Sequence, residues 1–160
     1  MSVDVDRTAL ELISLLEKAS IFQEKWQQSV VFKQMVQRYY RFMRLKSSYP
    51  PDILLIPTLD IEMIWQTHLL RPEVYKNDCL RLFGLVIDHS LILNNIDRTF
   101  KKEAFFDTCQ LYQERFGDQY CSLPVENKVA SNCSHSLCES SSYNYNEWIH
   151  FYWDETYFEF

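Results

Sequence analysis

The sequence predicts an all-α protein: a single domain of about five helices, followed by a less regular, aromatic-rich C-terminal segment. The chain has 160 residues, of which 47% are hydrophobic and 16% aromatic, enough apolar material for one compact core. Up to residue 117, apolar side chains recur at the three- and four-residue spacing of amphipathic helices. The two glycines, Gly84 and Gly117, each follow such a segment, at a place where glycine commonly ends a helix.

The first two helices are expected over residues 7–18 and 29–46, where apolar side chains share one face among charged neighbours. Ser29 is expected to cap the second helix, which ends before Pro50. The short apolar stretch 52–57 lies between prolines. It predicts a buried extended connector, because no second strand pattern accompanies it.

Three further helices are expected in the remainder of this region. Thr58 is placed to cap the third, which continues to about Leu70 with acidic residues in its first turn. Pro72 suits the first position of the fourth, which ends at Gly84. The fifth is expected over about residues 95–116 and is ended by the second glycine.

The composition changes after the predicted helical domain, which occupies residues 1–117. Residues 118–142 are rich in Ser and Asn and predict a loop or linker. Residues 143–160 form an acidic segment with nine aromatic side chains. Three interpretations of it stay open: packing on the helical core, binding a partner, or a divergent terminus.

Charge separates the two regions and excludes some classes of protein. Residues 1–117 hold 15 acidic and 15 basic residues, whereas residues 118–160 hold seven acids and one base, so the formal charge of −6 arises in the C-terminal region. A helical domain with balanced charge argues against nucleic-acid binding. The sequence shows neither a secretory signal nor an apolar run long enough for a membrane span, and its five irregularly spaced cysteines do not suggest disulfides. An intracellular, cytoplasmic protein is expected.

The strongest local pattern covers residues 55–69 and reads Leu-Ile-Pro-Thr-Leu-Asp-Ile-Glu-Met-Ile-Trp-Gln-Thr-His-Leu. Downstream of it stand Asp78-Cys79, Gly84 and Asp88-His89. Tyr39 and Phe42 precede the pattern, and Phe116-Gly117 and Tyr120 follow it. Over about residues 39–120 the chain resembles the glycine-rich domain-containing protein family.

This resemblance implies a fold and a shared pocket rather than a reaction. The pocket or motif positions that it indicates are Thr58, Trp65, Gln66, Thr67 and Cys79. Gln66 departs from the family pattern, which usually has a histidine at this position. No glycine-rich region accompanies the motif in this chain.

Two imidazoles and two carboxylates in this region suggest a metal site. On a helix, Asp60 and His68 lie near one face, and Asp78 and His89 could approach it from the following segments. Such a ligand set suits zinc or iron. Gln66 argues against the site, because an amide is a poor zinc ligand.

The alternative is a structural network, and the sequence favours it. In that interpretation Asp60 caps the helix start, His68 bonds a carbonyl near the helix end, and Asp88 and His89 fix a turn. Cys79 beside Asp78 could be a nucleophile, but a small buried hydrophobic residue is the favoured interpretation. Whether the protein is an enzyme is left open, with a non-enzymatic role favoured.

Two weaker patterns remain. A zinc knuckle would use Cys121, Cys133, His135 and Cys138, but its spacing is too tight and irregular, so a loop with incidental cysteines is favoured. The helix over residues 29–46 is basic, and its charges are expected on a solvated face rather than on an RNA surface. Attraction of the acidic C-terminal segment to these charges is a further hypothesis. These charges belong to Lys33, Arg38, Arg41, Arg44 and Lys46.

Together, these observations predict a non-enzymatic intracellular interaction module with a protein partner. The second hypothesis is a metal-dependent enzyme or metal-binding regulator that uses Asp60, His68, Asp78 and His89.

Overall fold

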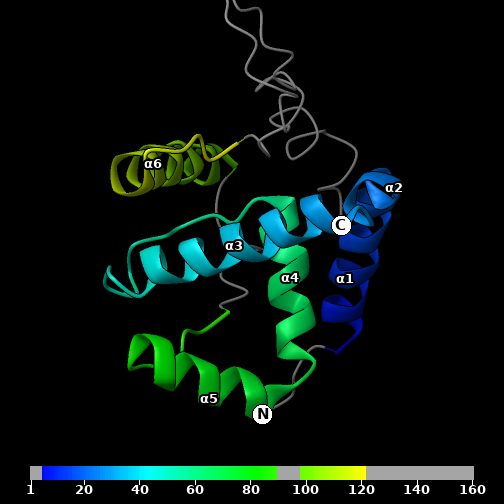
Figure 1. The fold of residues 1–160 in the computed structure, drawn as a ribbon, viewed down its shortest axis with the longest axis horizontal. Coiled ribbons are helices and arrows are strands. Elements are labelled where there is room, and N and C mark those ends of the chain that lie inside the picture. Colours follow the sequence, from blue (N-terminus) through cyan, green and yellow to red (C-terminus); the bar gives the residue numbers. More distant parts are fainter. Residues whose placement is uncertain (1–4, 90–97, 122–160) are drawn as a thin grey trace, which may run out of the picture. The chain divides into compact units, whose positions relative to one another are not determined.

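The structure, a computed structural model, describes residues 5–89 and 98–121 and contains six α-helices within them (Figure 1). The helices are α1 (Val5–Ser20), α2 (Gln23–Trp26), α3 (Ser29–Lys46), α4 (Leu59–Leu69), α5 (Pro72–Phe83) and α6 (Arg98–Phe116). No strand occurs in the described part of the chain, so the predicted all-α fold is confirmed. The segment 143–160 lies outside the described residues, as does most of the predicted linker.

The helix boundaries follow the predicted ones with two differences. The short helix α2 was not expected, which raises the number of helices from five to six. The expected cap of α3 was wrong, because Ser29 is the first residue of the helix and the preceding Gln28 makes no side-chain cap. Gly84 and Gly117 follow α5 and α6 with φ of +77° and +75°, left-handed values that residues with a Cβ rarely adopt.

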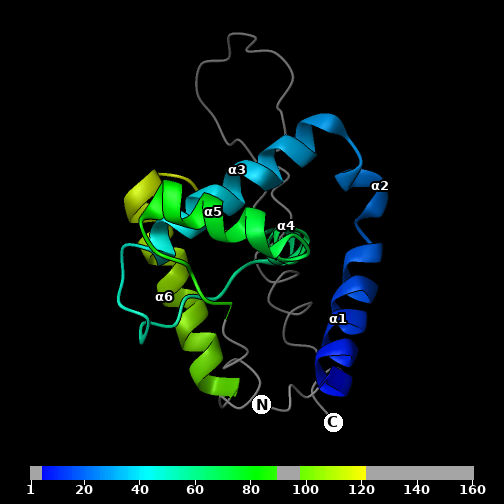
Figure 2. The same cartoon turned by 90° about the horizontal axis from the view of Figure 1, so that it is seen from below.

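Helix α4 is the centre of the described helical region. It packs against α1, α3 and α5, while α3 also packs against α2 and α6. Figure 2 looks along the axis of α4 and shows α1 on one side of it and α6 on the other. This compact unit continues to Tyr120, and none of its described helices is long and apolar enough to cross a membrane.

The core combines side chains of α3, α4 and α6 with the connector between α3 and α4. Phe42, Ile61 and Tyr112 are completely buried. Leu55, Ile56 and Pro57 of the connector are buried without regular secondary structure, as the sequence predicted, whereas Asp52 and Ile53 at its start are exposed. Backbone groups buried in this way need hydrogen-bond partners from elsewhere in the fold.

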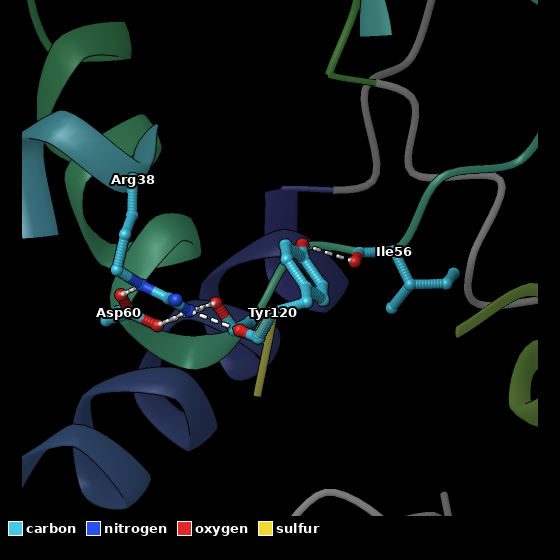
Figure 3. A network of polar contacts seen from close by, with 5 residues as sticks. Arg38, Ile56, Asp60 and Tyr120 are labelled. Carbon is cyan, nitrogen blue, oxygen red and sulfur yellow. Dashed lines mark hydrogen bonds and ion pairs between the residues drawn. The ribbon is translucent and has the colours of Figure 1, made fainter. Parts of the chain in front are cut away.

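Helix α6 and Tyr120 supply these partners to Ile56. The backbone N–H of Ile56 donates to the hydroxyl of Thr108 at 3.0 Å, and that hydroxyl donates to the carbonyl of Ala104 at 2.7 Å. The hydroxyl of Tyr120 donates to the carbonyl of Ile56 at 2.8 Å (Figure 3). The connector is therefore held by residues more than 50 positions later in the chain.

Arg38 contradicts the expectation that all charges of this helix lie on a solvated face. It is 6% exposed, and its Nε donates to Asp60 Oδ2 at 2.7 Å (Figure 3). Its Nη2 donates to the hydroxyl of Thr58 at 3.0 Å and to the carbonyl of Tyr120 at 2.7 Å. The guanidinium thus joins α3, the start of α4 and the end of the helical unit in one buried network.

Electrostatics agree with this placement of Arg38. Burial alone would lower the pKa of the guanidinium, but the charge and hydrogen bond of Asp60 outweigh burial and raise it. Asp60 is completely buried and also accepts a hydrogen bond from Thr58 at 2.6 Å. The acid near the start of α4 is therefore the counter-ion of Arg38, not the predicted helix cap.

We predict that Thr108→Val destabilises the protein by about 1–3 kcal/mol, because it leaves the buried N–H of Ile56 without an acceptor while conserving side-chain shape. Urea unfolding followed by circular dichroism measures the effect. Thr108→Ser, which keeps the hydroxyl, is the control and should lose less stability. Equal losses in the two variants would show that the methyl group, not the hydrogen bond, carries the effect.

Candidate functional site

Two features of α4 are candidates for function: a polar cluster on the side of α5 and an apolar groove on the side of α1. The polar cluster contains both histidines that the sequence singled out, His68 and His89, together with Tyr39, Glu62, Trp65, Gln66, Tyr75 and Asp78. The groove contains Thr67, one of the motif residues.

His68 links three helices. Its Nδ1 lies 2.9 Å from the hydroxyl of Tyr39 on α3, and its Nε2 lies 3.5 Å from Oδ2 of Asp78 on α5. Burial raises the pKa of Tyr39, so its hydroxyl stays protonated and can donate to Nδ1. In that arrangement Nε2 is the ring nitrogen that can donate to Asp78. The predicted bond from His68 to a helix-end carbonyl is therefore replaced by two side-chain partners.

Trp65 and Tyr75 fasten the segment after α5. The indole Nε1 of Trp65 donates to the hydroxyl of Tyr75 at 3.1 Å, and that hydroxyl donates to the carbonyl of Ile87. The ring of Tyr75 also meets His68 edge to face, with ring centroids 5.0 Å apart. Trp65, Tyr75 and Ile87 are buried, so these two consecutive hydrogen bonds lie inside the fold.

His89, at the end of the segment after α5, contacts Glu62 and Trp65 on α4. Its Nε2 lies 2.7 Å from Oε1 of Glu62, and its ring packs edge to face on Trp65 at 4.6 Å between centroids. Gln66 donates to the same carboxylate oxygen at 2.8 Å. Burial lowers the pKa of His89, but the hydrogen bond and charge of Glu62 outweigh it, with Asp88 adding to them, so the pKa is raised.

The four residues predicted as metal ligands do not come together as one set. Asp60 bonds Arg38, His68 and Asp78 face each other at 3.5 Å, and His89 bonds Glu62. Among the residues that the structure describes, no three His, Cys, Asp or Glu side chains are grouped so that they could hold a metal ion. The zinc or iron site remains a prediction from the sequence, and of its four residues only His68 and Asp78 are in contact.

The other singled-out residues have structural surroundings. Cys79 is 1% exposed and unbonded to another cysteine, as expected for a small buried hydrophobic residue. Thr58 is buried in the Arg38 network and makes no side-chain cap to α4. Thr67 is exposed, and its hydroxyl donates to the carbonyl of Met63. Of the residues considered for a zinc knuckle, Cys133, His135 and Cys138 lie outside the described part of the chain.

The groove is an open cavity of about 520 Å³ between α1, α2, α3 and α4. Its apolar lining includes side chains from all four helices, and its polar residues are Ser20, Gln23, Gln27 and Thr67. The lining residues are Leu16, Ala19, Ser20, Gln23, Trp26, Gln27, Phe32, Met35, Met63, Ile64 and Thr67. Leu16 and Phe32 are about half exposed, so the groove presents apolar surface to solvent.

Comparison with known proteins shows what part of this chain is similar to. The family model described as glycine-rich domain-containing protein-like matches residues 4–78, which include α1 to α4, the groove and His68. The family resemblance predicted from the sequence is confirmed. The matched residues 4–78 therefore contain the whole groove and most of the polar cluster.

Two relatives from Arabidopsis thaliana share this region. Glycine-rich domain-containing protein 1 is 34% identical over 82 residues, which are 51% of this chain and 10% of the relative. Glycine-rich domain-containing protein 2 is 32% identical over 105 residues, which are 62% of this chain and 13% of the relative. The chain thus matches only a small part of each relative. No solved structure matches it.

Sequence reasoning missed Arg38, Glu62 and Tyr75. Arg38 stands among four other bases in α3, and only its position on the helix distinguishes it. It lies one turn from the buried Met35 and Phe42, whereas Lys33 and Arg44 lie on the opposite face. Glu62 follows Asp60 in the first turn of α4, where an acid is favourable without any partner.

We predict that the His89–Glu62 pair makes stability depend on pH near neutrality. Because the folded-state pKa of His89 is raised, the contribution of the pair is fully present below pH of about 6.5 and is lost as the pH rises through the folded-state pKa. The wild type should therefore lose up to about 1 kcal/mol more than Glu62→Gln between about pH 6 and pH 8.5.

Urea unfolding at these two pH values measures this difference. Glu73→Gln, which removes an acid from the exposed first turn of α5, is the matched control and should behave as the wild type. Equal pH dependence in the wild type and Glu62→Gln would contradict the prediction.

Proposed function

We propose that the described helical unit is a non-enzymatic interaction module that binds an apolar segment of a partner protein in the groove between α1, α2, α3 and α4. The observation that carries the proposal is an open groove of about 520 Å³ whose lining is mostly apolar and includes Trp26, Phe32 and Met63. Apolar grooves of this kind commonly receive the apolar face of an amphipathic helix.

Exposed apolar residues around the groove support this proposal. Leu12 and Ile13 on α1 are 40% and 52% exposed, next to the groove residue Leu16 on the same helix. Contiguous exposed apolar surface is costly in water and often marks an interaction site. Met35 and Met63 in the lining have flexible side chains, which adapt to different apolar partners.

The polar cluster on the other side of α4 supports a structural role for the histidines. Both ring nitrogens of His68 face protein partners, and the thiol of Cys79 is buried. A nucleophile must be accessible beside a base, and the environment of Cys79 does not provide this. The cluster instead fixes α4, which supplies one wall of the groove.

Site-specific photo-crosslinking tests the proposal. A photo-crosslinking side chain placed at Thr67, which is exposed and lines the groove, should capture a partner protein in cells through a segment rich in apolar residues. Phe32→Glu puts a charge into the groove and should reduce the crosslink roughly tenfold or more.

Phe100→Glu is the matched control, because Phe100 is 50% exposed, like Phe32 at 51%, but lies on α6 outside the groove. This variant should crosslink as the wild type. An equal loss in both variants, or a crosslink that Phe32→Glu leaves intact, would sink the proposal.

A further inference from the structure

The groove is lined by uncharged side chains, although charged residues stand close to it in the chain. None of its described lining residues is an Asp, Glu, Lys, Arg or His. On α1 and α2 the acids Glu17 and Glu24 are balanced by the bases Lys18 and Lys25. Burial of a charge without a partner is costly, and the lining offers no partner. These features favour a ligand segment that is uncharged where it enters the groove.

Two of the four polar residues in the lining use their hydroxyl hydrogens within the protein. The hydroxyl of Ser20 donates to the carbonyl of Glu17 at 2.6 Å, and the hydroxyl of Thr67 donates to the carbonyl of Met63 at 2.8 Å. Each hydroxyl therefore donates to the backbone of its own helix. The hydrogen-bond donors that remain for a ligand come from elsewhere in the lining.

Helix α2 supplies these remaining polar groups. Gln23, Trp26 and Gln27 follow the spacing i, i+3 and i+4, so they lie on one face of α2, and all three line the groove. Gln23 and Gln27 are exposed, and neither side-chain amide has a hydrogen-bond partner among the described residues. Because α2 connects α1 to α3, it lies at the corner where these two walls of the groove meet (Figure 2).

The indole of Trp26 is a donor without an acceptor at this corner. Its side chain belongs to a residue that is only 8% exposed, and Nε1 is buried with no hydrogen-bond partner in the described part of the chain. A buried N–H that lacks an acceptor costs free energy, which an acceptor on a ligand would recover. An indole nitrogen can only donate, so the missing group is an acceptor.

From these groups we infer that the α2 corner is a polar subsite of the groove, which takes the carboxamide of an Asn or Gln side chain on the bound helix. A carboxamide is uncharged, and it supplies both an acceptor and donors to the two glutamines and the indole. The backbone carbonyls inside a bound helix do not serve, because they accept hydrogen bonds within that helix. This inference rests on the proposed function and adds the chemistry of the partner segment.

Binding at this subsite includes a movement of Trp26. Its Nε1 is covered in the free protein, so the indole turns toward the ligand when the hydrogen bond forms. Changes of side-chain rotamer are common at interfaces on binding. The exposed amides of Gln23 and Gln27 need no such change to reach the ligand.

Fluorescence anisotropy with synthetic peptides tests the subsite on the full chain. The parent peptide is a labelled amphipathic helix with a leucine face and an uncharged polar face, and in further peptides one leucine at a time is replaced by Asn. At one position, the ratio of Asn affinity to Leu affinity should be roughly tenfold higher in the wild type than in the double variant Gln23→Leu, Gln27→Leu. Asp at that position should bind at least about tenfold more weakly than Asn.

Gln28→Leu is the matched control. Gln28 is exposed and follows this face of α2 in the chain, but it does not line the groove, so the variant should keep the wild-type ratio. Circular dichroism checks that each variant is folded, which is expected because all three glutamines are exposed.

Nuclear magnetic resonance reports on the indole directly. The Nε1–H resonance of Trp26, assigned by its loss in Trp26→Phe, should move downfield when the preferred Asn peptide is added, because the N–H gains an acceptor. The leucine parent peptide should not produce this downfield shift.

The possible failures are distinguishable. Equal affinity ratios in the wild type and the double variant would overturn the subsite and leave the proposed function standing. Failure of every peptide to bind would overturn both. An Asp peptide that binds as tightly as the Asn peptide would also overturn the inference, because the groove would then accept a charge.

Discussion

A buried positive charge on α3 is the constraint on which the rest of the described structure depends. The guanidinium of Arg38 is enclosed by Asp60, Thr58 and the carbonyl of Tyr120, so it joins the start of α4 to the end of the helical unit. A buried charge that loses its partner costs several kcal/mol, which makes these contacts mutually dependent. The connector between α3 and α4 is fixed in the same place, because Tyr120 also binds the carbonyl of Ile56. The family match covers residues 4–78, whereas the network that completes this region reaches Tyr120.

The two sides of helix α4 differ in polarity and in their contacts. On the side of α5, His68, Trp65 and Glu62 bind partners from α3, α5 and the segment ending at His89. On the side of α1, Met63, Ile64 and Thr67 form one wall of an open apolar groove. The polar side uses nearly all its hydrogen-bonding groups within the protein, whereas the apolar side exposes surface that water solvates poorly. This contrast is why the histidines support a structural role and the groove supports a binding role.

Local patterns in the sequence predicted most of the helices, because helical spacing, Pro72 and the two glycines act within a few residues of one another. They also predicted the burial of the second half of the connector and of Cys79. They could not predict that Arg38 pairs with Asp60 or that Tyr120 binds both Arg38 and Ile56, since these contacts join residues 22 to 82 positions apart. The groove was missed for the same reason: its walls come from four helices, and no single helix carries a signal for it.

A double-mutant cycle between Arg38 and Asp60 tests the central claim most directly. The free energies of unfolding of the wild type, Arg38→Met, Asp60→Leu and the double variant would be measured by urea denaturation of the full chain. Each single substitution should cost about 3–5 kcal/mol because it leaves one buried charge without its counter-ion. The double variant should cost several kcal/mol less than the sum of the two, since no unpaired charge remains. Single losses below about 1 kcal/mol, or losses that add to within about 0.5 kcal/mol, would contradict the account.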